Sequence, residues 1–129
     1  QFDRVLNLLR PSGSVLEVAE VDQDAVTALS GSGPAYIFLI AEALQSAGEK
    51  LGLAPDVARE LTGQTIYGSA QMLRDGVDAA EARQRVTSPK GTTAAALEVL
   101  EERELRKAFD LALKAARDRS VELAKQAGD

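Results

Sequence analysis

From residue 22 onward, apolar residues recur at the three- and four-residue intervals of an amphipathic helix. The clearest case is the segment 34–51, whose apolar stripe comprises Ile37, Ile40, Ala41, Leu44, Ala47 and Leu51. Residues three or four apart share one face of a helix, so this spacing predicts a helix with one side directed inward. The same pattern predicts further helices over 22–30, 54–76, 78–86, 92–102 and 104–127.

Capping and breaking residues stand at the ends of these segments. Asp22 and Asp24 suit a helix N-terminus, where a carboxylate faces the positive end of the helix dipole. Pro34 suits the first turn of the next helix, because the N–H that proline lacks would have no partner there. Gly52 and Gly76 are placed to end the helices that precede them. The predicted fold class is an all-α helical bundle over residues 21–129.

The first twenty residues follow a different pattern. Residues 3–9 resemble the last turns of a helix, which the segment 11–13 (Pro-Ser-Gly) would break. Residues 14–21 are rich in valine and roughly alternate, which predicts a short extended strand. One strand cannot form a sheet, so residues 1–20 are expected to belong with a part that this chain lacks. The first residue, Gln1 rather than Met, also suggests a trimmed chain.

The predicted helices are rich in small residues: Ala43, Ala47, Gly48, Gly63, Gly68, Ser69 and Ala70. A glycine inside a helix costs roughly 1 kcal/mol relative to alanine, so Gly63 and Gly68 need a packing reason. One interpretation is close helix contact inside a single core. The other is interlocking with a second subunit, and the sequence leaves both open.

Composition excludes several classes of function. The chain of 129 residues fits one domain, and its 20 acidic against 15 basic residues disfavour a nucleic-acid partner. It has no Cys and no His, which excludes disulfides, thiolate zinc sites and Ser-His-Asp catalysis, and no metal site is expected. The longest apolar run, 35–44, contains Glu42 and is too short to cross a bilayer, so no membrane partner and a cytoplasmic location are expected.

Two glycine-containing segments are candidate ligand sites. The first, Ser30-Gly31-Ser32-Gly33-Pro34, is not a dinucleotide fingerprint, because Tyr36 replaces the third glycine and the segment follows a predicted helix rather than a strand. It is either a tight corner between helices or a loop whose bare backbone lets a ligand approach.

The second segment is 87–93, Thr-Ser-Pro-Lys-Gly-Thr-Thr. Pro89 forces Ser88 out of the helical region, and Gly91 leaves the next amides unshielded at the start of a predicted helix. Such amides bind carboxylate or phosphate, and Lys90 would add a positive charge. A plain helix cap, for which one hydroxyl suffices, is the alternative.

Together these segments make the chain resemble the C-terminal domain of a pyrroline-5-carboxylate reductase. The matching pieces are DAVTALSGSGPAYIFLIAEAL, LGLAPDVARELTGQTIYGSAQML, VTSPKGTTAAALEVLE and AARDRSVEL, and the resemblance extends from about Val15 to Leu123. It implies a parent oxidoreductase that reduces a cyclic imine acid to L-proline with NADPH or NADH. It also implies a homodimer, or a higher oligomer, of interlocking helical domains. The family's N-terminal Rossmann domain is absent, so residues 1–20 would be its tail and this chain alone would bind no cofactor and be inactive.

The resemblance also implies roles for single residues. Amides around Gly91 and Thr92, with Ser88, would receive the substrate carboxylate, and the Thr93 hydroxyl would bond the ring nitrogen as the catalytic contact. Ser30, Gly31, Ser32, Gly33 and Pro34 would lie near the nicotinamide end of the cofactor. Lys90 departs from the family, which usually has a second glycine there.

The sequence leaves two other hypotheses about the function of the chain open. One is a stand-alone helical oligomerisation module without catalysis. The other is the helical domain of a different imine or β-hydroxyacid reductase, which would need a catalytic lysine on a long central helix, whereas Lys50 falls at a predicted helix end.

Overall fold

The computed structural model describes residues 5, 11 and 13–128, and its described part is helical with no strand. The first element, η2, is a one-turn 3-10 helix, and the element labelled η3 is a π-helical turn. Their order is η2 (Glu20–Asp22), α2 (Gln23–Val26), η3 (Thr27–Gly31), α3 (Gly33–Lys50), α4 (Pro55–Arg74), α5 (Ala79–Arg85), α6 (Thr92–Glu102) and α7 (Leu105–Ala127). The all-α prediction is confirmed.

The strand predicted over 14–21 is wrong. Residues 14–19 have no regular structure, and η2 begins at Glu20, with the amide of Asp22 donating to the carbonyl of Ala19 at 3.0 Å. A strand needs a neighbouring strand for its backbone hydrogen bonds, and the described part of the chain provides none. The helix predicted over 3–9 lies almost wholly outside the described residues.

The predicted helix ends agree closely with the structure. Pro34 lies in the first turn of α3, and Pro55 lies in the first turn of α4. Gly52 and Gly76 have φ values of +100° and +89°, which only glycine adopts without strain. These two glycines therefore reverse the chain after α3 and α4.

The helix predicted over 22–30 is present but irregular. It passes from η2 through α2 into η3, where the amide of Ser32 donates to the carbonyl of Thr27 at 2.9 Å. This bond spans five residues instead of four, which is the mark of a π turn. Single π turns occur frequently at functional sites.

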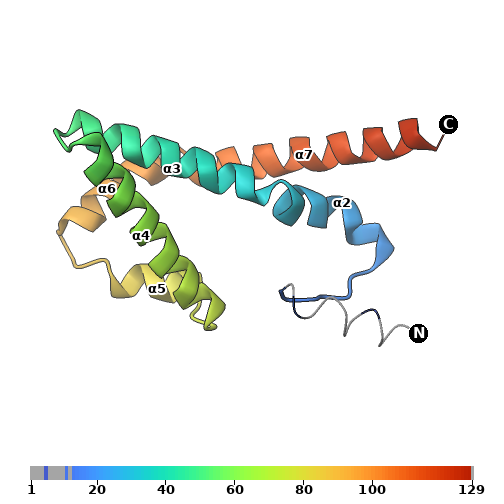
Figure 1. Ribbon diagram of the computed structural model, residues 1–129, viewed down its shortest axis with the longest axis horizontal. Helices are drawn as coiled ribbons and strands as arrows, with labels where there is room; N and C mark the ends of the chain where they lie inside the picture. Colours follow the sequence, from blue (N-terminus) through green and yellow to red (C-terminus); the bar gives the residue numbers. More distant parts are fainter. Residues whose placement is uncertain (1–4, 6–10, 12, 129) are drawn as a thin grey trace.

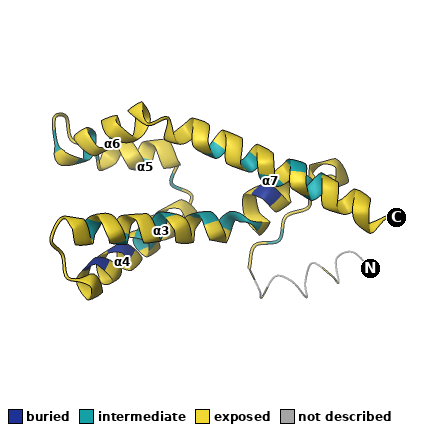
Figure 2. Cartoon of the chain, turned by 90° about the horizontal axis from the view of Figure 1, so that it is seen from above, coloured by how far each residue is buried: buried dark blue, intermediate teal, exposed yellow. Residues whose placement is uncertain are grey.

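The helices pack in a few pairs. α3 packs against α4, and α7 packs against α2, η3 and α6. Figure 1 shows α3 and α7 running along the long axis of the molecule, with α4, α5 and α6 gathered at one end. The arrangement is open, because α3 lies apart from α5 and α6 when the chain is viewed from above (Figure 2), although the end of α4 lines a pocket with α5.

One chain buries very little. The buried residues are Ala28, Ala58 and Thr62, and among the described residues no large side chain is fully buried (Figure 2). The accessible surface is 10725 Å², whereas a compact monomer of this mass exposes roughly 6,600 Å². Most of the predicted apolar stripe of α3 is uncovered, including Ile37 and Leu44, with Leu51 88% exposed beyond its end. Those faces need a covering surface that a single chain does not supply.

The space around each helical glycine distinguishes packing within one chain from packing against a second subunit. A Cβ added to Gly48 would lie 3.3 Å from the side chain of Leu53 and 3.5 Å from that of Ala58, so Gly48 permits the close contact of α3 with α4. A Cβ added to Gly63 or Gly68 would meet nothing within 4 Å. Packing inside one chain therefore explains Gly48 but not the two glycines in α4.

We predict that the double substitution Gly63→Ala, Gly68→Ala weakens self-association. Helix propensity alone would stabilise α4 by roughly 1 kcal/mol at each position. If a second copy packs closely against these glycines, the two methyl groups obstruct it, and the dimer dissociation constant rises at least about tenfold, a change of about 1.4 kcal/mol. Sedimentation equilibrium measures this constant. An unchanged constant together with a higher melting temperature would show that nothing packs there.

Candidate functional site

The segment between α5 and α6 contains a tight turn. The amide of Gly91 donates to the carbonyl of Ser88 at 3.1 Å, which closes the turn Ser88-Pro89-Lys90-Gly91. Pro89 occupies the second position and Lys90 the third, with φ of +57°. A proline followed by a residue with positive φ defines a type II turn, whose third position favours glycine. Lys90 therefore holds a backbone conformation that is unfavourable for a side chain.

Gly91 is required for a steric reason. Its φ of −84° and ψ of 176° are open to any residue, but an added Cβ would overlap the Ser88 hydroxyl and lie 3.1 Å from the Ser88 carbonyl oxygen. The missing side chain thus lets the Ser88 hydroxyl lie directly beside the start of α6. The structure brings these two predicted site residues together.

The start of α6 has no side-chain cap. Thr92 is its first residue, and among the described residues no side chain accepts a hydrogen bond from the first amides of this helix. By contrast, Asp78 caps α5 by accepting from the amides of Ala80 and Glu81, both at 3.0 Å. The prolines in the first turns of α3 and α4 remove one such amide from each of those helices. The structure therefore shows no side-chain cap from residues 87–93 at α6, although α7 also begins without one.

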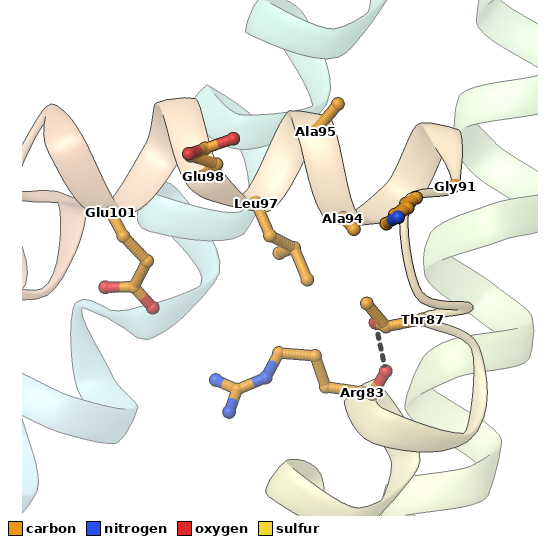
Figure 3. A pocket seen from close by; sticks show the side chains of 9 residues that line it. Arg83, Thr87, Gly91, Ala94, Ala95, Leu97, Glu98 and Glu101 are labelled. Atoms are coloured by element: carbon orange, nitrogen blue, oxygen red, sulfur yellow. Dashed lines mark hydrogen bonds between the residues drawn. The ribbon is translucent and has the colours of Figure 1, made fainter.

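A cavity of about 630 Å³ lies on one side of this segment. Its lining includes the charged residues Arg83, Lys90, Glu98 and Glu101, and Figure 3 shows Arg83 extending from α5 into the space below α6. The hydroxyl of Thr87 donates to the carbonyl of Arg83 at 2.6 Å and so ties the segment back to α5 (Figure 3).

The predicted substrate residues divide between two sides of the segment. Gly91 lines the cavity, but Ser88, Thr92 and Thr93 do not. Thr93 is half-buried, whereas Ser88 and Thr92 are exposed. The hydroxyls of Ser88, Thr92 and Thr93 are therefore not part of the cavity lining, whereas Ala94, in the first turn of α6, is.

Glu101, which lines the cavity, forms an ion pair with Arg106 across the turn between α6 and α7. The Arg106 guanidinium contacts the Glu101 carboxylate through bonds of 2.7 and 2.9 Å. These hydrogen bonds lower the pKa of Glu101, and the charge of Arg83 lowers it further. Both partners are exposed, so the pair orders the turn without contributing much to overall stability.

The second predicted segment, Ser30–Pro34, lies at the junction of η3 and α3. Ser30, Gly33 and Pro34 line an apolar groove of about 590 Å³, whose other walls include Phe109 and Leu113 of α7. A Cβ added to Gly33 would meet nothing within 4 Å, so its backbone is open to approach.

Two hydrogen bonds that sequence patterns did not predict frame this second segment. The Tyr36 hydroxyl donates to the carbonyl of Ala28 at 2.9 Å. The Ser120 hydroxyl donates to the Asp24 carboxylate at 2.7 Å and joins α7 to α2. Ser120 lies 96 residues from Asp24, so no local signal could have revealed that pair.

The two predicted segments are not adjacent within one chain. Figures 1 and 2 place α6 beside α5 at one end of the molecule, whereas the junction of η3 and α3 lies beside α2. A ligand that contacts both segments would need a second copy or another domain.

The described residues contain no cluster of three or more Asp or Glu side chains suited to a metal ion. None of the helices that the structure describes is both long enough and apolar enough to cross a membrane.

Fold and site together define a class: an all-α association domain with uncovered helix faces and an uncapped helix start at a glycine turn. The sequence profile of the family described as pyrroline-5-carboxylate reductase dimerisation matches residues 20–123. The chain belongs to this family.

Named relatives cover nearly the whole chain. The chain is 53% identical to the pyrroline-5-carboxylate reductase of Pseudomonas aeruginosa over 130 residues, with 99% of this chain and 48% of the relative aligned. It is 50% identical to the enzyme of Corynebacterium melassecola over 126 residues, 97% of this chain and 47% of the relative. The chain therefore spans about half the length of these relatives.

Solved structures show the same fold. A pyrroline-5-carboxylate reductase from Coxiella burnetii is similar with a TM-score of 0.90 and 47% identity, over 95% of this chain and 46% of that one. The pyrroline carboxylate reductase of Plasmodium falciparum, solved with NADP bound, is similar with a TM-score of 0.84 and 34% identity, over 92% and 48% of the two chains.

We predict that Lys90→Gly stabilises the protein. A left-handed conformation costs a residue with a side chain about 1–2 kcal/mol, and glycine removes this cost from the folded state. Glycine also raises the conformational entropy of the unfolded chain, which offsets part of the gain in stability. The expected net gain is about 0.5–1 kcal/mol in the free energy of unfolding. Urea denaturation at one fixed protein concentration measures it. Lys90→Ala is the control, because it removes the same charge but keeps a Cβ; an equal gain in both variants would contradict the argument from backbone strain.

We also predict a pH-dependent contribution from Glu101. Its pKa is lowered in the folded state, so the pair with Arg106 stabilises the fold at neutral pH and this contribution is lost as pH falls through the lowered pKa. Glu101→Gln should lower stability at pH 7 and have no effect in strong acid, with the difference shrinking in high salt. Glu102→Gln is the matched control, because Glu102 forms no ion pair with any described residue. Thermal melts across pH give the comparison, and a difference independent of pH would refute it.

Proposed function

We propose that this chain is the dimerisation and substrate-binding domain of an oxidoreductase that reduces 1-pyrroline-5-carboxylate to L-proline with NADPH or NADH. The observation that carries the proposal is the uncapped start of α6, with the Ser88 hydroxyl beside Gly91. Amides at a helix start attract anions, and the proposed substrate carries a carboxylate. The names of the relatives support the reaction.

In this proposal the turn residues hold the substrate by its acid group. Since the Gly91 amide closes the turn on the Ser88 carbonyl, the carboxylate is bound by the next amides, beginning with that of Thr92, and by the Ser88 hydroxyl. This contact fixes the ring relative to α6. Orientation of this kind is a large part of catalysis when the reacting group needs no strong general base.

The Thr93 hydroxyl contacts the ring nitrogen. Thr93 is half-buried, which restricts its side chain to few orientations. In the reduction, the carbon of the N-protonated C=N bond gains a hydride and the π electrons become the lone pair of the ring nitrogen, which yields the secondary amine of proline. The ring N–H donates to the Thr93 hydroxyl oxygen, and this hydrogen bond keeps the nitrogen in place while its charge is neutralised.

The dinucleotide would supply the hydride, and only its nicotinamide end would meet this chain. The open backbone at Gly33 and the apolar groove beside Ser30 and Pro34 suit a flat ring. The chain has no dinucleotide fingerprint for the rest of the cofactor. We therefore assign that part to a nucleotide-binding domain to which residues 1–20 connect, and we expect the 129-residue chain alone to be inactive.

A homodimer belongs to the proposal. The uncovered faces of α3 and α4 and the unexplained Gly63 and Gly68 support interlocking helices, and the family is one of dimerisation domains. Because the two predicted ligand segments are separated in one chain, the second copy also offers a way to bring one copy's α6 near the other copy's Ser30–Pro34.

We predict that Thr93→Val in the full-length reductase lowers kcat/KM by about 10²-fold, since it removes a transition-state hydrogen bond while keeping the side-chain shape. Thr92→Val is the matched control, because the proposal uses only the amide of Thr92; it should change kcat/KM by less than about threefold. Steady-state reduction of 1-pyrroline-5-carboxylate measures both.

Three other outcomes would contradict parts of the proposed function. Equal effects of the two valine variants would remove the special role of Thr93. A full-length protein without turnover would favour a plain oligomerisation module, and NAD(P)H-dependent turnover by the 129-residue chain alone would contradict the division into two domains. The reading as a β-hydroxyacid reductase domain has less support, because Lys50 is the last residue of α3 and not central in it.

A further inference from the structure

The π turn at η3 depends on a contact from α3. In a regular α-helix the amide of Ser32 would bond the carbonyl of Ala28, but here it bonds the carbonyl of Thr27 at 2.9 Å. The Tyr36 hydroxyl takes the vacated place and donates to the Ala28 carbonyl at 2.9 Å. Ala28 is only 1% exposed, so its carbonyl would otherwise lack a partner away from water.

The position of Tyr36 fits this role. It lies in the first turn of α3, eight residues after Ala28, and is half-buried. Its ring also lines the apolar groove together with Phe109 and Leu113 of α7. The ring is therefore anchored by packing while the hydroxyl reaches back across the turn.

A second bond fixes the other side of the same segment. The Ser120 hydroxyl holds the Asp24 carboxylate at 2.7 Å and so joins α2 to α7. Asp24 precedes η3, and Tyr36 follows it. The residues Ser30–Pro34 lie between these two attachment points, at the junction of α2 and α3 in Figure 1.

We propose that Tyr36 is a positioning residue that sets the backbone register of Ser30–Pro34. This inference rests on the proposed function, in which that segment meets the nicotinamide end of the dinucleotide. Without the hydroxyl, the buried carbonyl of Ala28 competes with that of Thr27 for the amide of Ser32. The segment then alternates between π and α hydrogen bonding, two registers that differ by one residue, about 100° of rotation.

The first test is hydrogen exchange in the 129-residue chain. Tyr36→Phe removes only the hydroxyl, and the amide of Ser32 should then exchange about three- to tenfold faster, because it opens each time it changes between the carbonyls of Thr27 and Ala28. Tyr67→Phe is the matched control, because Tyr67 lies exposed on α4 and should leave Ser32 unchanged. Equal exchange rates at Ser32 in wild type and Tyr36→Phe would overturn the proposal.

The second test separates positioning from general destabilisation. In the full-length reductase, Tyr36→Phe should raise KM for the dinucleotide about three- to tenfold while KM for 1-pyrroline-5-carboxylate changes less than about twofold. An active enzyme with both KM values unchanged, or with both raised alike, would contradict the role of Tyr36. Absence of turnover in the wild type would instead contradict the proposed function, and the exchange rate of Ser32 would still decide the role of Tyr36.

Discussion

The structure depends on apolar helix surface that one chain does not cover. α3, α4 and α7 are long helices with apolar residues on more than one side, yet the buried set is Ala28, Ala58 and Thr62. Helices are held in folded proteins mainly by packing of their apolar faces and only weakly by their own propensity. Association is therefore part of folding for this domain, in agreement with its membership of a dimerisation family.

This constraint also explains where the candidate ligand segments lie. The turn at Ser88–Gly91 precedes α6, whose first amides have no side-chain cap, and the π turn at η3 leads into the open backbone at Gly33. Within one chain the two are apart, because α6 and the junction of η3 and α3 lie in different parts of the molecule. An open chain that closes only on its partner can assemble a site from both copies, which would make catalysis in the parent enzyme depend on association.

Much of the fold could be predicted from the sequence, because the signals for a helix lie within the short segment that forms it. Periodic apolar residues located the helices, and Pro34, Gly52 and Gly76 marked their ends correctly. The strand over 14–21 failed because alternation is a weak signal when no partner strand exists. The predicted burial of the α3 stripe was incomplete, since periodicity identifies a face but not what covers it.

The candidate site was only partly accessible to sequence reasoning. Gly91 and the helix start at Thr92 were predicted from the order Ser-Pro-Lys-Gly-Thr. The positive φ of Lys90 follows from the same turn, yet only the structure showed it. The bond between Ser120 and Asp24 and the bond from Tyr36 to Ala28 depend on packing, which no local pattern encodes.

The most direct test of the central claim is the solution mass of the 129-residue chain, measured by light scattering over a dilution series with circular dichroism on the same samples. The account predicts twice the chain mass of 13.7 kDa, or a higher multiple, at every concentration at which the chain remains helical. Loss of helix should accompany dissociation. A stable, fully helical monomer of 13.7 kDa would contradict the account, because its uncovered apolar faces would then need no partner.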